Sequence, residues 1–459
     1  FESYFSSLKG KKIAVLGLGV SNRPLVELLL EYGCDVTGCD RTPREKLDAQ
    51  VLELENRGCK LRGGEGYLDG VEADILFRTP GMHPGNPAIQ ALRAGGAQVT
   101  SEMEVFFEVC PCRIIGVTGS DGKTTTTTLV SEMLKASGKR VWLGGNIGTP
   151  LLPLCRQMCK EDFAVVELSS FQLMDMKRSP QRALITNLAP NHLDIHKDME
   201  EYVDAKKNIF KYQDKSGILV LNADNDLLPA AQVPSRLRAV WFGIEAEDAD
   251  VRAMDITAGA NGTAFRIVDR EYGSFAASIP TVGLHTVYDA LAAYAAATRM
   301  GLDAARCAAA LADYQTTGMR QHIVEHGGVT FIEDCYNASP DSMRAALSVL
   351  KELPNSRKIA LLGDMLELGI ASEEGHRSTG AWVADAGVDQ LIAYGPCSAA
   401  MAEAAKARGV ATVHCQTAAE VLQYLRQFVR PGDAVLAKAS HAMGLEQLLQ
   451  DFYKELPQG

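Results

Sequence analysis

The chain has 459 residues, of which 46% are hydrophobic and 22% charged, and its formal net charge is −11. This length allows two to four domains with their own cores, and the composition is that of an ordinary soluble globular protein. The negative charge argues against nucleic acid or an anionic membrane as the main partner, and no run of 18 apolar residues predicts a membrane-spanning helix. Because the eleven cysteines are scattered, we expect reduced thiols and a cytoplasmic protein.

Residues 9–42 form the first predicted nucleotide-binding unit. A strand at 12–16 leads into the turn Gly17-Leu18-Gly19-Val20-Ser21-Asn22, a helix follows, and a second strand ends in Asp40. This spacing is typical of a dinucleotide fingerprint, with Asn22 in the place of the third glycine. Two interpretations stay open at this point: NAD(P) binding, or binding of the ribose and diphosphate of a substrate.

A further strand at 73–77 runs into the rigid turn Thr79-Pro80-Gly81-Met82. Ligands of open α/β sheets bind at the carboxyl ends of the strands, so this turn is a candidate ligand contact. A plain turn is the alternative interpretation.

The stretch from Gly116 to Thr125 is the strongest motif in the chain. It reads Gly-Val-Thr-Gly-Ser-Asp-Gly-Lys-Thr-Thr, follows an apolar strand and precedes an apolar helical pattern over 129–134. Strand, glycine-rich turn and helix predict a phosphate-binding loop, although Val117 replaces the first glycine of the usual pattern. Backbone N–H groups would surround the phosphates of ATP, Lys123 would neutralise them, and Thr124 would ligate Mg²⁺. A surface turn before a helix is the alternative. The predicted ATP-binding residues of this loop are Gly119, Ser120, Asp121, Gly122, Lys123, Thr124 and Thr125.

Three polar side chains farther along are candidates for the same site. A buried strand at 163–167 ends in Glu167, which is where a second Mg²⁺ ligand belongs beside an ATP loop. His192 lies in a loop after the next strand, where a satisfied loop histidine is an equally good interpretation. Lys206 lies on a predicted helix, and by itself it would be an ordinary solvated lysine.

The rest of the chain continues in an α/β pattern. Residues 217–280 are rich in strands, and from about 320 strands alternate with helices. We predict an α/β fold of three domains. These are a Rossmann-like N-terminal domain (1–111), a central P-loop ATPase-like domain (112–318) and a C-terminal Rossmann-like domain (319–459).

Several motifs together resemble the Mur ligases of peptidoglycan synthesis. They are the phosphate loop, Gly-Gly-Asn-Ile-Gly at 144–148, Glu-Leu-Ser-Ser-Phe-Gln-Leu at 167–173, Asn-His-Leu-Asp-Ile-His at 191–196 and Tyr-Val-Asp-Ala-Lys-Lys at 202–207. Within the family, residues 9–222 resemble the members that add D-glutamate. The C-terminal part instead resembles the members that add D-alanyl-D-alanine, through the stretches 334–343, 362–369 and 438–443.

The resemblance implies an ATP-dependent, Mg²⁺-requiring ligase that adds D-glutamate to UDP-N-acetylmuramoyl-L-alanine through an acyl phosphate, and it implies a monomer. It makes Lys123, Glu167, His192 and Lys206 the catalytic residues. Thr124, Glu167, His192 and Lys206 would hold two metal ions. Lys206 would be carbamylated, which turns a cationic side chain into an anionic oxygen ligand for a hard metal.

The remaining site residues are also implied by the resemblance. Further ATP contacts would be Asp289, Arg320 and Asp334. Contacts to the UDP-linked substrate or the incoming amino acid would be Val20, Ser21, Asp40, Arg41, Thr79, Gly81, Asn146, Ser169, Tyr336 and Ser440.

The sequence departs from the D-glutamate-adding pattern in two places. Thr286 and Asp289 replace two asparagines that contact adenine, and Tyr336 stands where those members have a lysine. Addition of another amino acid or of D-alanyl-D-alanine is therefore an alternative. A nucleotide-binding module without catalysis is a second alternative, and an NAD-dependent oxidoreductase is the least favoured.

Overall fold

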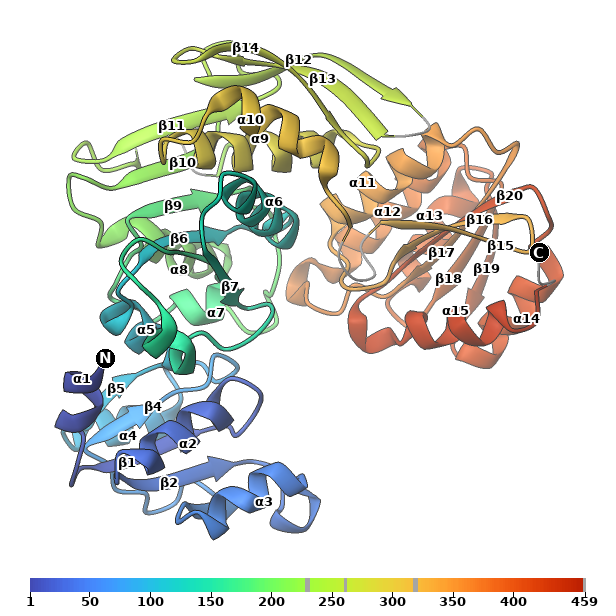
Figure 1. Ribbon diagram of the computed structural model, residues 1–459. Coiled ribbons are helices and arrows are strands. Elements are labelled where there is room, and N and C mark those ends of the chain that lie inside the picture. Colours follow the sequence, from blue (N-terminus) through green and yellow to red (C-terminus); the bar gives the residue numbers. More distant parts are fainter. Residues whose placement is uncertain (228–231, 260–261, 317–320, 457–459) are drawn as a thin grey trace.

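The computed structural model describes residues 1–227, 232–259, 262–316 and 321–456. These residues form three β-sheets covered by helices (Figure 1). The predicted α/β class with a Rossmann-like, a P-loop and a second Rossmann-like unit is confirmed. In the described part of the chain, no helix is long and apolar enough to cross a bilayer.

The N-terminal sheet has five parallel strands in the order β3-β2-β1-β4-β5. The strands are β1 (Lys12–Leu16), β2 (Asp35–Asp40), β3 (Lys60–Gly63), β4 (Ile75–Phe77) and β5 (Gln98–Thr100). The helices are α1 (Glu2–Ser7), α2 (Asn22–Glu31), α3 (Ala49–Asn56), α4 (Pro87–Ala94) and α5 (Glu102–Val109). Because all strands are parallel, the turn after β1, Asp40 and the turn after β4 share one edge of the sheet.

The central sheet has nine strands in the order β14-β13-β12-β11-β10-β9-β6-β8-β7. Its parallel part comprises β6 (Arg113–Thr118), β7 (Val141–Gly145), β8 (Phe163–Glu167), β9 (Arg182–Ile185), β10 (Ile218–Asn222), β11 (Arg238–Gly243) and β12 (Val251–Gly259). The strands β13 (Gly262–Asp269) and β14 (Gly273–Ile279) add an antiparallel extension. The helices are α6 (Lys123–Ala136), α7 (Ser170–Leu173), α8 (Met199–Lys211), α9 (Leu284–Thr298) and α10 (Ala304–Ala310).

The C-terminal sheet has six strands in the order β15-β16-β20-β17-β18-β19, with only β15 antiparallel. They are β15 (His322–His326), β16 (Val329–Asp334), β17 (Arg357–Gly363), β18 (Gln390–Tyr394), β19 (Ala411–Cys415) and β20 (Asp433–Lys438). The helices are α11 (Pro340–Glu352), α12 (Ser372–Asp385), α13 (Ala399–Ala407), α14 (Ala418–Phe428) and α15 (Leu445–Tyr453).

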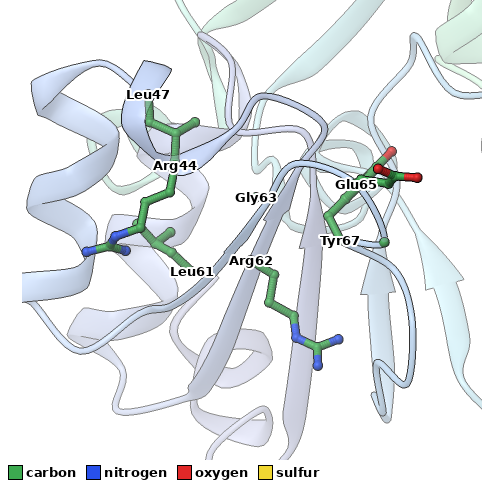
Figure 2. Close-up of a pocket in the computed structure, with 8 residues that line it drawn as sticks. Arg44, Leu47, Leu61, Arg62, Gly63, Glu65 and Tyr67 are labelled. Carbon is green, nitrogen blue, oxygen red and sulfur yellow. The ribbon is translucent and has the colours of Figure 1, made fainter.

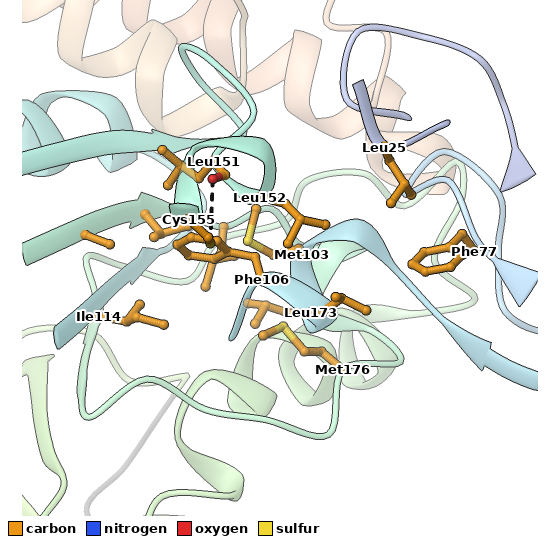
Figure 3. Packing of buried hydrophobic residues seen from close by; sticks show 14 of the residues in the cluster. Leu25, Phe77, Met103, Phe106, Ile114, Leu151, Leu152, Cys155, Leu173 and Met176 are labelled. Atoms are coloured by element: carbon orange, nitrogen blue, oxygen red, sulfur yellow. Dashed lines mark hydrogen bonds between the residues drawn. The ribbon is translucent and has the colours of Figure 1, made fainter. Parts of the chain in front are cut away.

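The hydrophobic core is not divided in the same way as the sheets. One cluster joins N-terminal residues such as Leu25 and Phe77 to Met103 and Phe106 of α5 and to Leu152 of the central unit (Figure 3). The opposite face of the central sheet packs against α6 and α9, and each face of the C-terminal sheet has a cluster of its own. The first two units thus share extensive apolar packing, whereas the C-terminal unit meets the central one through Val282, which joins its apolar cluster, and through the polar contacts described below.

Candidate active site

The loop between β6 and α6 has the backbone of a phosphate-binding loop. Gly119 has a φ of 152° and Gly122, the N-cap of α6, a φ of 75°. A Cβ atom at Gly119 would lie 1.8 Å from Thr186 Oγ1, and one at Gly122 would lie 2.0 Å from Asp289 Oδ1. Both positions therefore require glycine, for backbone conformation and for space. The N–H groups that open α6 face the end of the parallel sheet, where an anion would bind.

Lys123 is the first residue of α6, and its side chain bends back over the loop. Its Nζ atom donates to the carbonyl oxygens of Gly119 at 3.1 Å and Ser120 at 2.8 Å. The loop is tied to the rest of the central unit by Ser120, whose Oγ lies 2.8 Å from the hydroxyl of Tyr202. The amino group of Lys123 is thus held against the loop that is predicted to bind phosphate.

Thr124 and Glu167 meet as their positions in the sequence predict. Thr124 Oγ1 donates to Glu167 Oε2 at 2.7 Å, and both side chains are buried. Asn146, which follows β7, donates through Nδ2 to Glu167 Oε1 at 2.9 Å. A hydroxyl and a carboxylate beside a phosphate loop are the hard oxygen donors that Mg²⁺ prefers, so this pair fits the predicted metal.

Lys206 is buried on α8 and reaches the same loop. Only 1% of the residue is exposed, and its Nζ donates to the Gly119 carbonyl oxygen at 2.7 Å. Burial, reinforced by the positive charge of Lys123, holds the pKa of Lys206 well below its ordinary value. Its neighbour Lys207 behaves as a surface residue and pairs with Asp204. The structure therefore distinguishes two adjacent lysines that the sequence alone does not.

His192 lies in the left-handed backbone region, with a φ of 55°, and its ring packs against Phe171. Its Nδ1 atom is 3.1 Å from Oε2 of Glu367, which follows β17 in the C-terminal unit. Burial opposes ionisation of Glu367, but the hydrogen bonds that it accepts from His192 and Asn337 bring its pKa below the ordinary value. Sequence reasoning missed Glu367, although the residue lies within the conspicuous stretch 362–369.

The four predicted metal ligands do not form one contact group. Thr124 contacts Glu167, whereas His192 contacts Glu367 and Lys206 contacts the loop backbone. Within the ranges that the structure describes, no three His, Cys, Asp or Glu side chains gather closely enough to hold a metal. A metal here would use the threonine hydroxyl and a modified lysine, which are not members of that donor set.

The remaining predicted ATP contacts differ in what the structure shows. Asp289, on α9, is buried against Gly122, and Thr126 Oγ1 donates to its Oδ1 at 3.4 Å. Asp334 ends β16, and its Oδ2 accepts from Lys438 Nζ at 2.7 Å. Arg320 lies outside the described residues. Of the two described acids, Asp289 is thus the one that touches the phosphate loop directly.

The two predicted C-terminal substrate contacts also differ from each other. Tyr336 is exposed, and its ring centroid is 6.0 Å from that of His441. Ser440 is buried, and its Oγ accepts from the Leu366 backbone N–H at 2.9 Å. Its hydroxyl therefore already supports the segment that carries Glu367. Substrate binding by either residue stays a prediction.

The predicted contacts of the N-terminal unit lie along one edge of its sheet. Asp40 accepts from the backbone N–H of Leu18 at 2.8 Å and of Thr42 at 2.9 Å. Burial alone would raise the pKa of Asp40, but these hydrogen bonds lower it below the ordinary value. Val20 and Arg41 are exposed on this edge, and Ser21 is the N-cap of α2.

The turn that holds Thr79 and Gly81 is fixed by Arg78, a residue that sequence reasoning missed. Arg78 is buried, and its guanidinium donates to the carbonyl oxygens of Thr79 and Met82 and, across to the central unit, to that of Phe171 at 3.0 Å. Ser169, two residues before Phe171, caps α7 by accepting from Gln172 N. Hydrogen bonds of Arg78 therefore connect the candidate site of the N-terminal unit to that of the central unit.

A pocket of about 370 Å³ opens beside Asp40, at the carboxyl ends of β2 and β3 (Figure 2). It is lined by Arg44, Leu47, Leu61, Arg62, Gly63, Glu65, Gly66 and Tyr67. The lining combines the guanidinium group of Arg62 and the ring of Tyr67 with the carboxylate of Glu65, whereas the guanidinium group of Arg44 is paired with Glu55.

Comparison with known proteins identifies the family. The "Mur ligase middle domain" matches residues 117–297, and the "Mur ligase, glutamate ligase domain" matches residues 319–441. The UDP-N-acetylmuramoylalanine--D-glutamate ligase of Clostridium novyi (strain NT) is 41% identical over 358 residues, which are 77% of this chain and 76% of that protein. The enzyme of the same name from Clostridium botulinum (strain Hall) is 55% identical over 228 residues, half of each chain.

Solved structures show the same fold at low identity. MurF from Acinetobacter baumannii has a TM-score of 0.70 at 22% identity and covers 92% of this chain and 91% of its own. MurF ligase from Thermotoga maritima in complex with ADP has a TM-score of 0.67 at 20% identity, with 98% and 96% covered. The matched domains and the relative that is 41% identical over three quarters of its length agree with the resemblance seen in the sequence. The chain belongs to the Mur ligase family.

Proposed function

We propose that the chain is an ATP-dependent ligase of peptidoglycan precursor synthesis that joins D-glutamate to UDP-N-acetylmuramoyl-L-alanine. The observation that carries the chemistry is the phosphate loop, with Lys123 folded over it and Thr124, Glu167 and Lys206 around it. The choice of D-glutamate is supported by the relatives that are 41% and 55% identical, both of which are UDP-N-acetylmuramoylalanine--D-glutamate ligases.

The reaction has two steps in this proposal. The terminal carboxylate of the UDP-linked substrate attacks the γ-phosphorus of ATP, which gives an acyl phosphate and ADP. The amino group of D-glutamate then attacks the acyl carbon, and an amide forms as phosphate leaves. Lys123 and the N–H groups that open α6 would stabilise the negative charge on the transferred phosphoryl group, which is where such sites gain most of their rate.

Thr124 and Glu167 would hold Mg²⁺, which would supply positive charge to offset the negative charge on the transferred phosphoryl group. We propose that Lys206 is carbamylated. Its burial and lowered pKa support this, because an unprotonated amine is the form that reacts with carbon dioxide. The carbamate would replace a buried amine by an anionic oxygen donor near the loop, where a hard metal needs one.

The N-terminal unit would bind the UDP part of the substrate. Asp40 and the Thr79–Gly81 turn lie on one sheet edge, and the pocket with Arg62 and Tyr67 lies beside them, which supports a site for a diphosphate and a flat base. The strands of the three sheets fall within 1–111, 112–318 and 319–459, which supports these ranges as the domains. We also propose that the protein is a monomer located in the cytoplasm.

Release of phosphate tests the proposal. The chain is incubated with ATP, Mg²⁺ and UDP-N-acetylmuramoyl-L-alanine, and D-glutamate and D-alanyl-D-alanine are compared as second substrates. We expect turnover with D-glutamate. Turnover with the dipeptide alone would show the D-glutamate assignment to be wrong, and ATP binding without turnover in either reaction would favour a non-catalytic module.

The dipeptide is the second candidate because of what the C-terminal unit offers. Tyr336 replaces the lysine of the D-glutamate-adding members, and Lys438, the buried cation nearby, is bound by Asp334 and by the carbonyl oxygen of Asn337 at 2.8 Å. Neither residue presents an ammonium group to the side-chain carboxylate of D-glutamate. The comparison of the two substrates therefore measures which part of the chain determines the amino acid that is added.

A further inference from the structure

The hydrogen-bond partner of His192 comes from a different domain. His192 follows β9 in the central unit, whereas Glu367 follows β17 in the C-terminal unit, and His192 Nδ1 is 3.1 Å from Glu367 Oε2. A backbone hydrogen bond runs beside this contact, from Leu193 N to the Glu367 carbonyl oxygen at 3.1 Å. The two segments therefore meet through a side-chain pair and a main-chain pair, which together fix the carboxylate relative to the imidazole ring.

Glu367 is itself held in place within the C-terminal unit. Its Oε2 accepts from Asn337 Nδ2 at 3.1 Å. The preceding residues are fixed by two further bonds, from Leu366 N to Ser440 Oγ at 2.9 Å and from Met365 N to His376 Nε2 at 3.0 Å. The carboxylate is thus preorganised by three separate segments of its own domain.

The central and C-terminal units also pack closely at Gly369, two residues after Glu367. Gly369 has a φ of 51°, and a Cβ atom there would lie 2.4 Å from the Leu193 carbonyl oxygen. A second polar contact joins the same two units, from Ser339 Oγ to Asp121 Oδ1 of the phosphate loop at 3.0 Å. The position of the C-terminal unit is therefore defined at two separate points of the candidate active site.

Metal-binding histidines usually donate the N–H of the second ring nitrogen to a carboxylate. That bond fixes the tautomer and the orientation of the ring, and it makes the other nitrogen a better ligand. In this chain Nδ1 donates to Glu367, so Nε2 keeps its lone pair for a cation. We infer that Glu367 is the positioning residue that orients His192 as a metal ligand, so that metal affinity depends on contact with the C-terminal domain.

This inference rests on the proposed role of His192 as a metal ligand. It adds that the carboxylate is supplied from the third domain, so that the metal site is complete only when that domain lies against the central one. Binding of metal would then favour contact between the C-terminal and central domains. Domain contact and metal binding are coupled equilibria, so each strengthens the other by the same factor.

The test is the affinity of the full chain for Mn²⁺, measured by the electron paramagnetic resonance signal of the free ion in the absence of nucleotide. The variants are His192→Ala, Glu367→Ala and Glu367→Gln. The control is Glu373→Gln, an exposed residue of α12 that pairs with Arg377. Loss of the carboxylate in Glu367→Ala should weaken Mn²⁺ binding by about 10- to 100-fold. The amide oxygen introduced by Glu367→Gln can still accept from Nδ1, so we expect a smaller loss, and the control should bind as the parent chain does.

A ¹⁵N spectrum of the histidine rings gives a readout that general destabilisation would not change. The parent chain should show His192 with its proton on Nδ1, and Glu367→Ala should show a mixture of tautomers.

Three results would overturn the inference. If His192→Ala weakens Mn²⁺ binding and neither Glu367 variant does, the metal role of His192 stands and the role of Glu367 is wrong. If His192→Ala binds Mn²⁺ normally, the proposed metal role of His192 fails, and the inference fails with it. If Glu367→Ala does not fold, unchanged affinity in Glu367→Gln decides against the inference.

Discussion

Ser339 and Asp121 are 218 residues apart in the sequence, yet Ser339 Oγ donates to Asp121 Oδ1 at 3.0 Å. Ser339 is also the N-cap of α11, where the same oxygen accepts from Ser342 N. The other oxygen of Asp121 is buried and has no hydrogen-bond partner among the described residues. An acid in the middle of the phosphate loop therefore has one oxygen bound by the third domain and one that is buried without a partner among the described residues. We therefore expect binding of ATP to the loop to affect the contact between the loop and the third domain.

Gly122→Ala should abolish ATP binding and destabilise the chain. The new Cβ would lie 2.0 Å from Asp289 Oδ1, and the residue would keep a φ of 75° that alanine adopts only with strain. The matched control is Gly138→Ala, because Gly138 has a φ of 73° and nothing within 4 Å of its Cβ position. We expect about 1–3 kcal/mol of destabilisation from strain in both variants. Melting temperature and ATP titration should show an additional loss only at Gly122, and equal behaviour of the two variants would exclude the steric role of Asp289.

Lys206→Ala should lower turnover by about a hundredfold or more, because it would remove a charged group from the preorganised site. Lys207→Ala is the control, since Lys207 pairs with Asp204 at the surface. Short carboxylates such as formate or acetate should restore part of the activity of Lys206→Ala if the missing group is a carbamate oxygen. Near-normal turnover in Lys206→Ala would remove this lysine from the site. Failure of every carboxylate to restore activity would contradict carbamylation.

The apolar runs of the sequence were sufficient to predict much of the fold. The predicted bounds of β1 (12–16) and β8 (163–167) agree with the structure, because each strand is a short and mostly hydrophobic run. β3 and β15 were not predicted. Their side chains are mostly polar and exposed, at the edges of their sheets, so that no apolar pattern marks them.

The candidate site was predictable only where it is local in sequence. The loop from Gly119 to Thr124 can be identified from its glycines and its flanking strand and helix. The burial of Lys206 could not be derived from the residues around it, because it depends on how α8 packs beneath the loop; the resemblance alone singled it out. The contact of Glu367 with His192 depends on how two domains meet, and a single sequence carries no periodic signal for that.

Arg299→Ala should be among the most destabilising substitutions outside the site. Arg299 follows α9, and its Nη2 donates to Asp269 Oδ1 of β13 at 2.9 Å, with both side chains almost fully buried. Removal of the guanidinium leaves the buried Asp269 carboxylate without a counter-charge, with only the backbone N–H groups of Glu271 and Tyr272 as donors, at a cost of about 3–5 kcal/mol. Arg238→Ala breaks an exposed pair with Glu271 and should cost about 1 kcal/mol or less. The free energies of unfolding of the two variants are compared by urea titration. Similar losses of stability would mean that the buried Arg299–Asp269 pair contributes no more to stability than the exposed Arg238–Glu271 pair.

Glu102 should make stability depend on pH near neutrality. It is the first residue of α5, between the N-terminal and central units, and its carboxylate oxygen accepts from Leu152 N at 3.3 Å. Burial raises the pKa of Glu102 to about 7, and the single hydrogen bond offsets this only in part. A carboxyl group whose pKa is higher in the folded than in the unfolded chain takes up a proton on folding. Its contribution to stability is therefore fully present below the ordinary value of 4.5 and is lost as the pH rises toward 7.

Glu102→Gln should remove this dependence, because the amide keeps the shape of the protonated acid and does not ionise. We expect the melting temperature of the variant to equal that of the parent chain near pH 5 and to exceed it at pH 8. Glu132→Gln, at an exposed position of α6 that pairs with Lys135, is the control and should follow the parent chain throughout. If the difference between Glu102→Gln and the parent chain is the same at both pH values, Glu102 does not change its protonation on folding in this range. In that case a water or a rearranged Leu152 N–H must stabilise the buried carboxylate at the junction of the first two domains.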